Sequence, residues 1–490
     1  MPRLAFIVTT LVLAVPLAFG GGGPAALAQS AQPTLNWAPC GDVPGTECAG
    51  LQLPVDYDNP NGAQFTLRLG RVPAVDPAKR KGVLLILPGG PGAGIREELG
   101  GMRTEQHIPE FQQQYDVVTF DPRGIGKSSP IRCDPAAAPK VQMPMDRQPT
   151  QAEFDALARA NAAFFKSCGE ATGELFWHLS SKDTVQDIER IRQALTPSEG
   201  IVSYAASYGS EYGAAYLETY PQNIKALALD AVMDHTIEYG PFLARNVLSV
   251  QDSFERMEQW CAREAKCALH GKDLGAALDA AIAREPKMRT LVPQMLAGGD
   301  EPQFGWPMVT TLLAEVNSSG ESKLMKEIAG SLALGTAEDP WLRAGKDGLF
   351  RGVICSDYGP QRDYAKLLPI AEMLTKAAPR FVWKFWDSSP MEHASAGIGD
   401  CVGWPQEARF PPHLLQVGPH RDVMVSSATH DPPTPLANAL AVYLQTPEAR
   451  LTIADSDGHQ ALIVSQCAYE TAARFLDDPE SVSSVTLCGK

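Results

Sequence analysis

Short apolar runs that end in loops and alternate with helix-like stretches constrain the fold of this chain most. The runs are short and aliphatic, which is typical of strands buried on both faces of a parallel sheet. In the first half of the chain they occupy residues 82–87, 115–120, 200–204 and 225–232. Between two of them, residues 184–195 place apolar side chains at helical spacing. This alternation predicts an α/β fold with a mostly parallel sheet.

The alternation stops in the second half of the chain. From residue 236 to residue 410 the sequence is mostly helix-like with loops, and strand-like runs return at residues 421–428 and 449–456. We therefore predict one α/β domain, made of residues 29–235 and 411–490. A helical insertion at 236–410 interrupts this domain.

The N-terminus has the pattern of a secretory signal peptide. Arg3 precedes a short apolar run that Pro16 interrupts, and an A-x-A site ends at Ala28. The pattern predicts export with cleavage after Ala28. A retained anchor is the alternative, but the run is short and no later stretch is long and apolar enough to span a bilayer. We therefore expect a secreted protein without a stable membrane anchor.

Charge and cysteine content narrow the classes of partner and cofactor. The net charge of −15 argues against a nucleic-acid partner. Ten cysteines, an even number in an exported chain, indicate disulfides, although sequence alone does not fix their connectivity. Metal binding is the alternative, but no C-x-x-C pair and no clustered histidines support it. We expect neither a metal nor an organic cofactor.

The stretch "SYAASYGSEYG" places Ser207 where a predicted strand turns into a helix. A serine hydroxyl needs an adjacent base and a fixed, exposed position to act as a nucleophile. A sharp strand-to-helix turn supplies the exposure and requires small residues on both sides. Ala205 and Gly209 occupy these places, although glycine is usual at the first of them. A serine that caps the helix is the alternative interpretation.

A glycine-rich loop, "PGGPGAG", follows the strand predicted at 82–87. In hydrolases of this layout a backbone N–H from such a loop and the N–H after the nucleophile bind the oxyanion. Here these would be the N–H groups of Gly90 (or Gly89) and Tyr208. A tight turn or a phosphate loop is the alternative, but the Lys-Ser/Thr pair of a Walker motif is missing.

Two further residues follow the ends of later strands. Asp431 lies in "HDPPTP" and His459 in "DSDGHQAL". Open α/β sheets place their sites at this edge, and the order Ser207, Asp431, His459 is the order that α/β hydrolases use. The ordered set predicts a catalytic triad.

Together these motifs resemble those of secreted tripeptidyl aminopeptidases and related proline iminopeptidase-like α/β hydrolases. The resemblance covers nearly the whole mature chain and rests on "PGGPGAG", "YDVVTFDPRGIGKSSPIRC", "SYGSEYG", "WCAREAKCAL", "CVGWP" and "DPPTP" with the later "GH". It implies Ser207 as nucleophile, Asp431 as orienting acid, His459 as base and the insertion as a lid. Ala205 departs from the glycine that is usual in the family.

The resemblance also implies disulfides between cysteines that neighbour each other along the chain. The implied pairs are Cys40–Cys48, Cys133–Cys168, Cys261–Cys267, Cys355–Cys401 and Cys467–Cys488.

The motifs predict an exported serine hydrolase, and the resemblance implies an exopeptidase, expected to be monomeric, that releases short peptides, expected to be tripeptides, from free N-termini. Such an enzyme needs a carboxylate to hold the substrate ammonium, since an unpaired buried charge is costly. Glu238, Glu255 and Glu258, early in the insertion, are the candidates. A secreted carboxylesterase or a single-residue proline iminopeptidase would use the same triad. A non-catalytic binding protein on a hydrolase scaffold is the third possibility.

Overall fold

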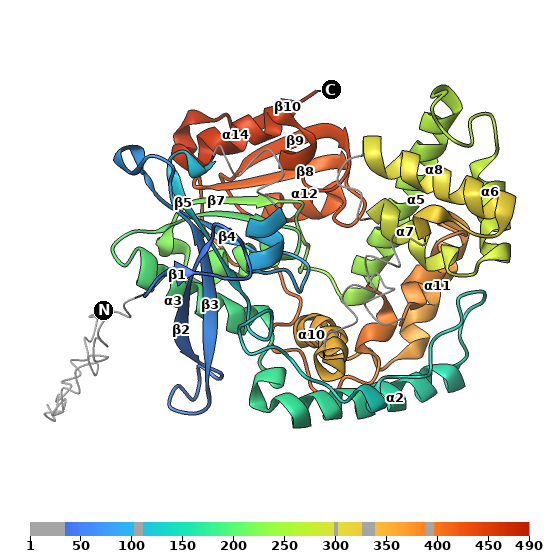
Figure 1. Ribbon diagram of the computed structural model, residues 1–490, viewed down its shortest axis with the longest axis horizontal. Coiled ribbons are helices and arrows are strands. Elements are labelled where there is room, and N and C mark those ends of the chain that lie inside the picture. The colour runs from blue at the N-terminus through green and yellow to red at the C-terminus, as the bar shows by residue number, and fades with distance from the viewer. Residues whose placement is uncertain (1–34, 102–110, 298–301, 326–338, 389–395, 490) are drawn as a thin grey trace, which may run out of the picture. The chain divides into compact units, whose positions relative to one another are not determined.

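One mixed sheet carries the fold. Its strand order is β1-β2-β3-β5-β4-β6-β7-β8-β9-β10 (Figure 1). Strands β1 to β3 are antiparallel, β3 pairs antiparallel with β5, and every pairing from β5 through β10 is parallel. The predicted α/β fold with a mostly parallel sheet is confirmed. The strands are β1 (Ala38–Pro39), β2 (Glu47–Pro54), β3 (Gln64–Val72), β4 (Gly82–Leu87), β5 (Tyr115–Asp121), β6 (Ile201–Ala206), β7 (Ile224–Asp230), β8 (Val423–His430), β9 (Arg450–Asp457) and β10 (Val485–Cys488).

The computed structural model describes residues 35–101, 111–297, 302–325, 339–388 and 396–489. The predicted signal peptide and its cleavage site lie outside these residues. Among the described helices, none combines the length and the apolar character that crossing a bilayer requires. The longer helices are α2 (Gln151–Thr172), α3 (Ser181–Leu195), α4 (Tyr208–Thr219), α5 (Tyr239–Arg263), α6 (Leu274–Arg284), α7 (Met288–Ala297), α8 (Pro302–Ser319), α10 (Pro340–Tyr358), α11 (Tyr364–Ala377), α12 (Leu436–Gln445) and α14 (Gln466–Asp477).

Side-chain alternation along the central strands builds two hydrophobic layers. In β4, Leu84 and Ile86 pack into the layer that Tyr469 and Phe475 of α14 also join. The alternate residues of the strand, Leu85 among them, pack into the larger layer shared with α3, α4 and α5. Both faces of the strand are therefore buried, which explains why its sequence is continuously apolar.

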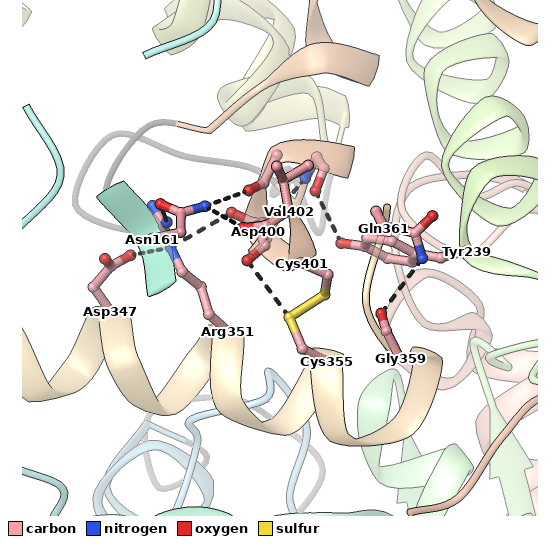
Figure 2. Close-up of a disulfide and its surroundings, with 12 residues drawn as sticks. Asn161, Tyr239, Asp347, Arg351, Cys355, Gly359, Gln361, Asp400, Cys401 and Val402 are labelled. Atoms are coloured by element: carbon pink, nitrogen blue, oxygen red, sulfur yellow. Dashed lines mark hydrogen bonds and ion pairs between the residues drawn. A yellow bond between two sulfur atoms is a disulfide. The ribbon is translucent and has the colours of Figure 1, made fainter. Parts of the chain in front are cut away.

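The helices α5 to α11 lie between β7 and β8 in the chain, within the span predicted as a lid. Helix α2, between β5 and α3, packs on α10, although the sequence analysis had assigned its residues to the core domain. Buried polar side chains join α2 and α10 with the segment around Cys401 (Figure 2). Asn161 of α2 donates hydrogen bonds to the carbonyl oxygens of Gly399 (2.9 Å) and Val402 (2.8 Å), and accepts one from Arg351 of α10 (3.2 Å).

The charges around this contact are buried and paired. Arg351 bonds Asp347 at 3.0 Å and lies 3.7 Å from Asp400. Burial raises the pKa of Asp400 to about 7, and the nearby Arg351 guanidinium opposes that shift. A buried arginine is tolerated only where carboxylates and carbonyls satisfy its donors, so this cluster joins α2, α10 and the segment around Cys401 in one arrangement.

All ten cysteines form the five disulfides that the resemblance implied. The bonds are Cys40–Cys48, Cys133–Cys168, Cys261–Cys267, Cys355–Cys401 and Cys467–Cys488.

Removing the Cys355–Cys401 disulfide is expected to destabilise the protein strongly. The bond closes a loop with a sequence separation of 46, and the chain-entropy estimate for such a loop is about 4 kcal/mol. Replacing both cysteines with alanine should lower the free energy of unfolding by about this amount, measured by denaturant titration. The same exchange at Cys40 and Cys48, separated by 8 residues, is the control and should cost about 2.5 kcal/mol. An unchanged midpoint after loss of Cys355–Cys401 would contradict the prediction.

Candidate active site

Ser207 lies at the turn between β6 and α4. Its backbone has φ 55° and ψ −129°, a left-handed conformation that costs a non-glycine residue roughly 1–3 kcal/mol. The Ser207 N–H donates to the Asp230 carbonyl (3.1 Å), which anchors the turn to the end of β7. The serine side chain is partly exposed while its neighbours on both sides are buried. The structure thus places Ser207 in the strained, accessible position that a nucleophile needs.

The small residues of this turn are explained by what they contact. A side chain at Gly209 would overlap the Leu87 carbonyl oxygen. The Ala205 methyl, fully buried, faces Gly213 of α4, where an added Cβ would lie 3.2 Å from it and 2.5 Å from Leu229 Cδ2. The room for Ala205 therefore comes from Gly213. Sequence reasoning missed this residue, although a glycine inside a helix is itself a signal because it costs about 1 kcal/mol.

Replacing Ala205 with glycine should leave turnover within about two-fold of wild type, because the elbow already has room for the methyl group. We expect a loss of about 1–2 kcal/mol of stability from the lost methyl burial and the added backbone freedom. Gly213→Ala should lower the melting temperature further, since its methyl group meets Ala205 and Leu229. The double variant should recover part of that loss, because the two sites are in contact. Strictly additive melting shifts would contradict this explanation.

Asp431 and His459 form a buried pair. His459 Nδ1 lies 3.0 Å from each carboxylate oxygen of Asp431, and Thr434 Oγ1 lies 3.3 Å from the same nitrogen. Each carboxylate oxygen also accepts a backbone N–H, one from Thr434 (2.9 Å) and one from Gln460 (3.2 Å). A carboxylate at Nδ1 fixes the tautomer that leaves Nε2 to act as the base.

The three predicted triad residues share one edge of the sheet. Ser207 follows β6, Asp431 follows β8 and His459 follows β9, with β6, β7, β8 and β9 consecutive in the sheet. Parallel strands bring their carboxyl ends to the same edge. The structure therefore places all three residues on the side of the sheet where the sequence analysis expected a site.

Asp230, the last residue of β7, connects the two halves of this site. Its carbonyl accepts the Ser207 N–H, and its buried carboxylate accepts the N–H groups of Ala461 (3.1 Å) and Leu462 (3.2 Å), just after His459. The Tyr204 hydroxyl adds a bond at 3.1 Å. Burial raises the pKa of Asp230 despite these donors. Sequence reasoning missed Asp230; its only signal is an acidic residue at the end of an apolar strand.

The glycine-rich loop packs directly on the turn at Ser207. An added Cβ at Gly89 would lie 3.4 Å from Ser207 Cβ and 3.9 Å from the Tyr208 nitrogen. The Gly89 N–H donates to Glu98 Oε1 at 3.3 Å. Burial raises the pKa of Glu98 to about 7. The role of Gly90 (or Gly89) as partner of Tyr208 in an oxyanion hole stays a prediction.

The turn "DPRGIG" braces this edge of the sheet through the hydrogen bonds of Asp121 and Arg123. Asp121 accepts the N–H groups of Ile95 and Lys127, both at 2.9 Å, and so ties the glycine-rich loop to the turn after β5. The fully buried Arg123 forms two bonds with Asp187, at 2.8 and 2.7 Å.

The predicted amine-binding carboxylates lie on or before α5. Glu238 precedes the helix and is exposed, and Glu255 is exposed and accepts a hydrogen bond from Gln251 (2.8 Å). Glu258 is partly buried, and burial raises its pKa. A role of any of the three in holding a substrate ammonium stays a prediction.

One group of described side chains has metal-ligand spacing. Asp56, Glu174 and His178 each offer a ligand atom, and these atoms lie within 4.8 Å of one another. Glu174 is exposed, and none of the three belongs to the site described above.

The chain is similar to known protein families and to several named relatives. A family model described as "alpha/beta hydrolase fold" matches residues 82–297, and one described as "TAP-like protein" matches residues 390–488. Serine protease Hip1 of Mycobacterium tuberculosis is 28% identical, covering 92% of this chain and 90% of the relative. Carboxylesterase B of the same species is 27% identical (90% and 88%), and the tripeptidyl aminopeptidase of Streptomyces lividans is 24% identical (93% and 86%). The solved proline iminopeptidase of Mycobacterium smegmatis aligns with a TM-score of 0.37 at 13% identity, over 88% of this chain and 98% of that chain.

Proposed function

We propose that the protein is an exported serine exopeptidase, because it has an α/β-hydrolase fold and its residues 390–488 match the model described as "TAP-like protein". In this proposal it releases short peptides, tripeptides foremost, from free N-termini. The observation that carries the proposal is the His459–Asp431 pair at the same sheet edge as the strained Ser207. The relatives named serine protease and tripeptidyl aminopeptidase support it.

The proposed chemistry is acyl transfer. His459 Nε2 takes the proton of the Ser207 hydroxyl as Oγ attacks the scissile carbonyl. The N–H groups of Gly90 and Tyr208 receive the oxyanion, and loss of one such donor costs roughly 3 kcal/mol in enzymes of this kind. His459 then protonates the leaving amine, and water attacks the acyl-enzyme with the same histidine as base. Asp431 stabilises the imidazolium in both steps.

The substrate and the setting follow from the same proposal. The partners are peptides with a free N-terminus, and we expect a monomer with no nucleic-acid partner. Five disulfides support export to an oxidising compartment. A carboxylesterase is the second proposal, because the triad also hydrolyses esters and one relative is named Carboxylesterase B. A single-residue proline iminopeptidase is the third.

Mass spectrometry of the products separates these proposals. Purified enzyme is incubated with a peptide carrying a free N-terminus, with its N-acetylated form and with short acyl esters. Tripeptide release from the free peptide alone supports the main proposal, whereas release of single residues indicates an iminopeptidase. Turnover of esters with both peptides untouched would contradict the peptidase proposal.

A further inference from the structure

Helix α5 of the insertion contacts the loops that carry Asp431 and His459. Four polar residues of this helix, spaced along one side, each bond Asp431 or a residue within two positions of Asp431 or His459. Asn246 Nδ2 donates to the carbonyl oxygens of Pro432 (3.3 Å) and Pro433 (3.1 Å), and Ser249 Oγ donates to the carbonyl of Asp431 itself (2.7 Å).

The same side of α5 continues along the ends of β8 and β9. Asp252 bonds the His430 ring at 2.8 Å, between Oδ2 and Nδ1. Arg256 bonds Asp457 at 2.9 Å, between Nη2 and Oδ2. His430 directly precedes Asp431. The contact between its ring and Asp252 therefore fixes the end of β8 to α5.

The loop after Asp431 depends on these bonds because of its own sequence. Pro432 and Pro433 have no N–H group, so neither can tie the loop down as a donor. Their carbonyl oxygens, and that of Asp431, are held instead by Asn246 and Ser249. A shift of this backbone would move the Asp431 carboxylate relative to His459 Nδ1.

The Asn246 amide is itself oriented from inside the insertion. The fully buried Lys384 donates through Nζ to Asn246 Oδ1. An ammonium can only donate, so it fixes the amide oxygen on its side and turns the Nδ2 donors toward the loop. Hydrogen bonds thus connect Lys384, through Asn246, to the backbone of the loop after Asp431.

We propose that Ser249 and Asn246 are positioning residues for the reaction, and that α5 of the insertion holds the Asp431 carboxylate in register with His459. The inference rests on the proposed hydrolase function and deepens it. The insertion then contributes to the rate itself, through Asp431.

The test compares Ser249→Ala with Ser253→Ala. Ser253 lies on the same helix and is buried, whereas Ser249 is partly exposed, and within the described residues no hydrogen bond joins the Ser253 hydroxyl to the loop after Asp431. Ser249→Ala should lower kcat about 10–100-fold with KM within about two-fold, because a misplaced orienting group affects the transition state. The acidic limb of the kcat/KM profile should shift to lower pH, because a misplaced carboxylate stabilises the imidazolium less. Ser249→Thr, which keeps the hydroxyl, should restore most of the rate.

Asn246→Asp is the second variant, so the inference can still be tested if Ser249→Ala does not fold. It keeps the shape and the partner of Lys384 but removes both donors to the proline carbonyls, so the same loss of kcat is expected. Melting temperatures are measured for all variants. If Ser249→Ala and Asn246→Asp keep the kcat and pH limb of Ser253→Ala, the inference is wrong. A folded wild type that hydrolyses neither peptides nor esters overturns the proposed function, and this inference with it.

Discussion

Replacing Ser207 with alanine is expected to lower kcat/KM by about 10⁴- to 10⁶-fold, as removal of the nucleophile does in other serine hydrolases. The reason is that alanine offers no atom that can form the acyl-enzyme, while the oxyanion donors and the binding surface remain. The fold should be unaffected, because the anchoring bond of the turn uses the Ser207 backbone N–H and the Asp230 carbonyl. Steady-state kinetics on the best peptide substrate give the measurement.

Ser203→Ala is the matched control for this variant. Ser203 is a fully buried serine on the same strand, β6, and its hydroxyl donates to the Leu85 carbonyl at 2.8 Å. Its loss should reduce stability and leave kcat/KM within a few-fold of wild type. Comparable activity of Ser207→Ala and Ser203→Ala would show that Ser207 is not the nucleophile.

Replacing Asp431 with asparagine is expected to lower kcat by about 10⁴-fold, as in serine proteases where the wrong imidazole tautomer results. The structure adds a second reason. Each carboxylate oxygen accepts a backbone N–H, from Thr434 or from Gln460. An amide would therefore direct its NH₂ group at one of these donors in either orientation. Kinetics across pH, with melting temperature as the check on folding, measure the effect.

Asp455→Asn supplies the control for this exchange. Asp455 is exposed near the end of β9, so the same chemical change there should leave kcat unchanged. If Asp431→Asn retains more than about a tenth of the wild-type kcat, then Asp431 does not orient the base in the way proposed.

The positions of the three proposed triad residues in the sheet could be predicted because they depend on a general property of parallel sheets. Ser207, Asp431 and His459 each follow an apolar strand, and the carboxyl ends of such strands meet at one edge. Local sequence therefore located them without any knowledge of long-range contacts.

The supporting residues could not be predicted because their roles exist only in the folded chain. Asp230 bonds residues more than two hundred positions away, and Ser249 reaches the backbone of Asp431 from another helix. Gly213 explains Ala205 through a contact between a helix and a strand. The packing of α2 on α10 could not be predicted either, because the periodicity of a helix does not show which other helix it packs on.

The central claim is that Ser207 is an activated nucleophile, and covalent labelling tests it most directly. A fluorophosphonate probe is added to the folded wild-type protein, and the adduct is located by proteolysis and mass spectrometry. We predict one modified site, Ser207, with labelling that is lost in Ser207→Ala and strongly slowed in Asp431→Asn. An adduct on another residue, or equal labelling of wild type and Ser207→Ala, would contradict the account.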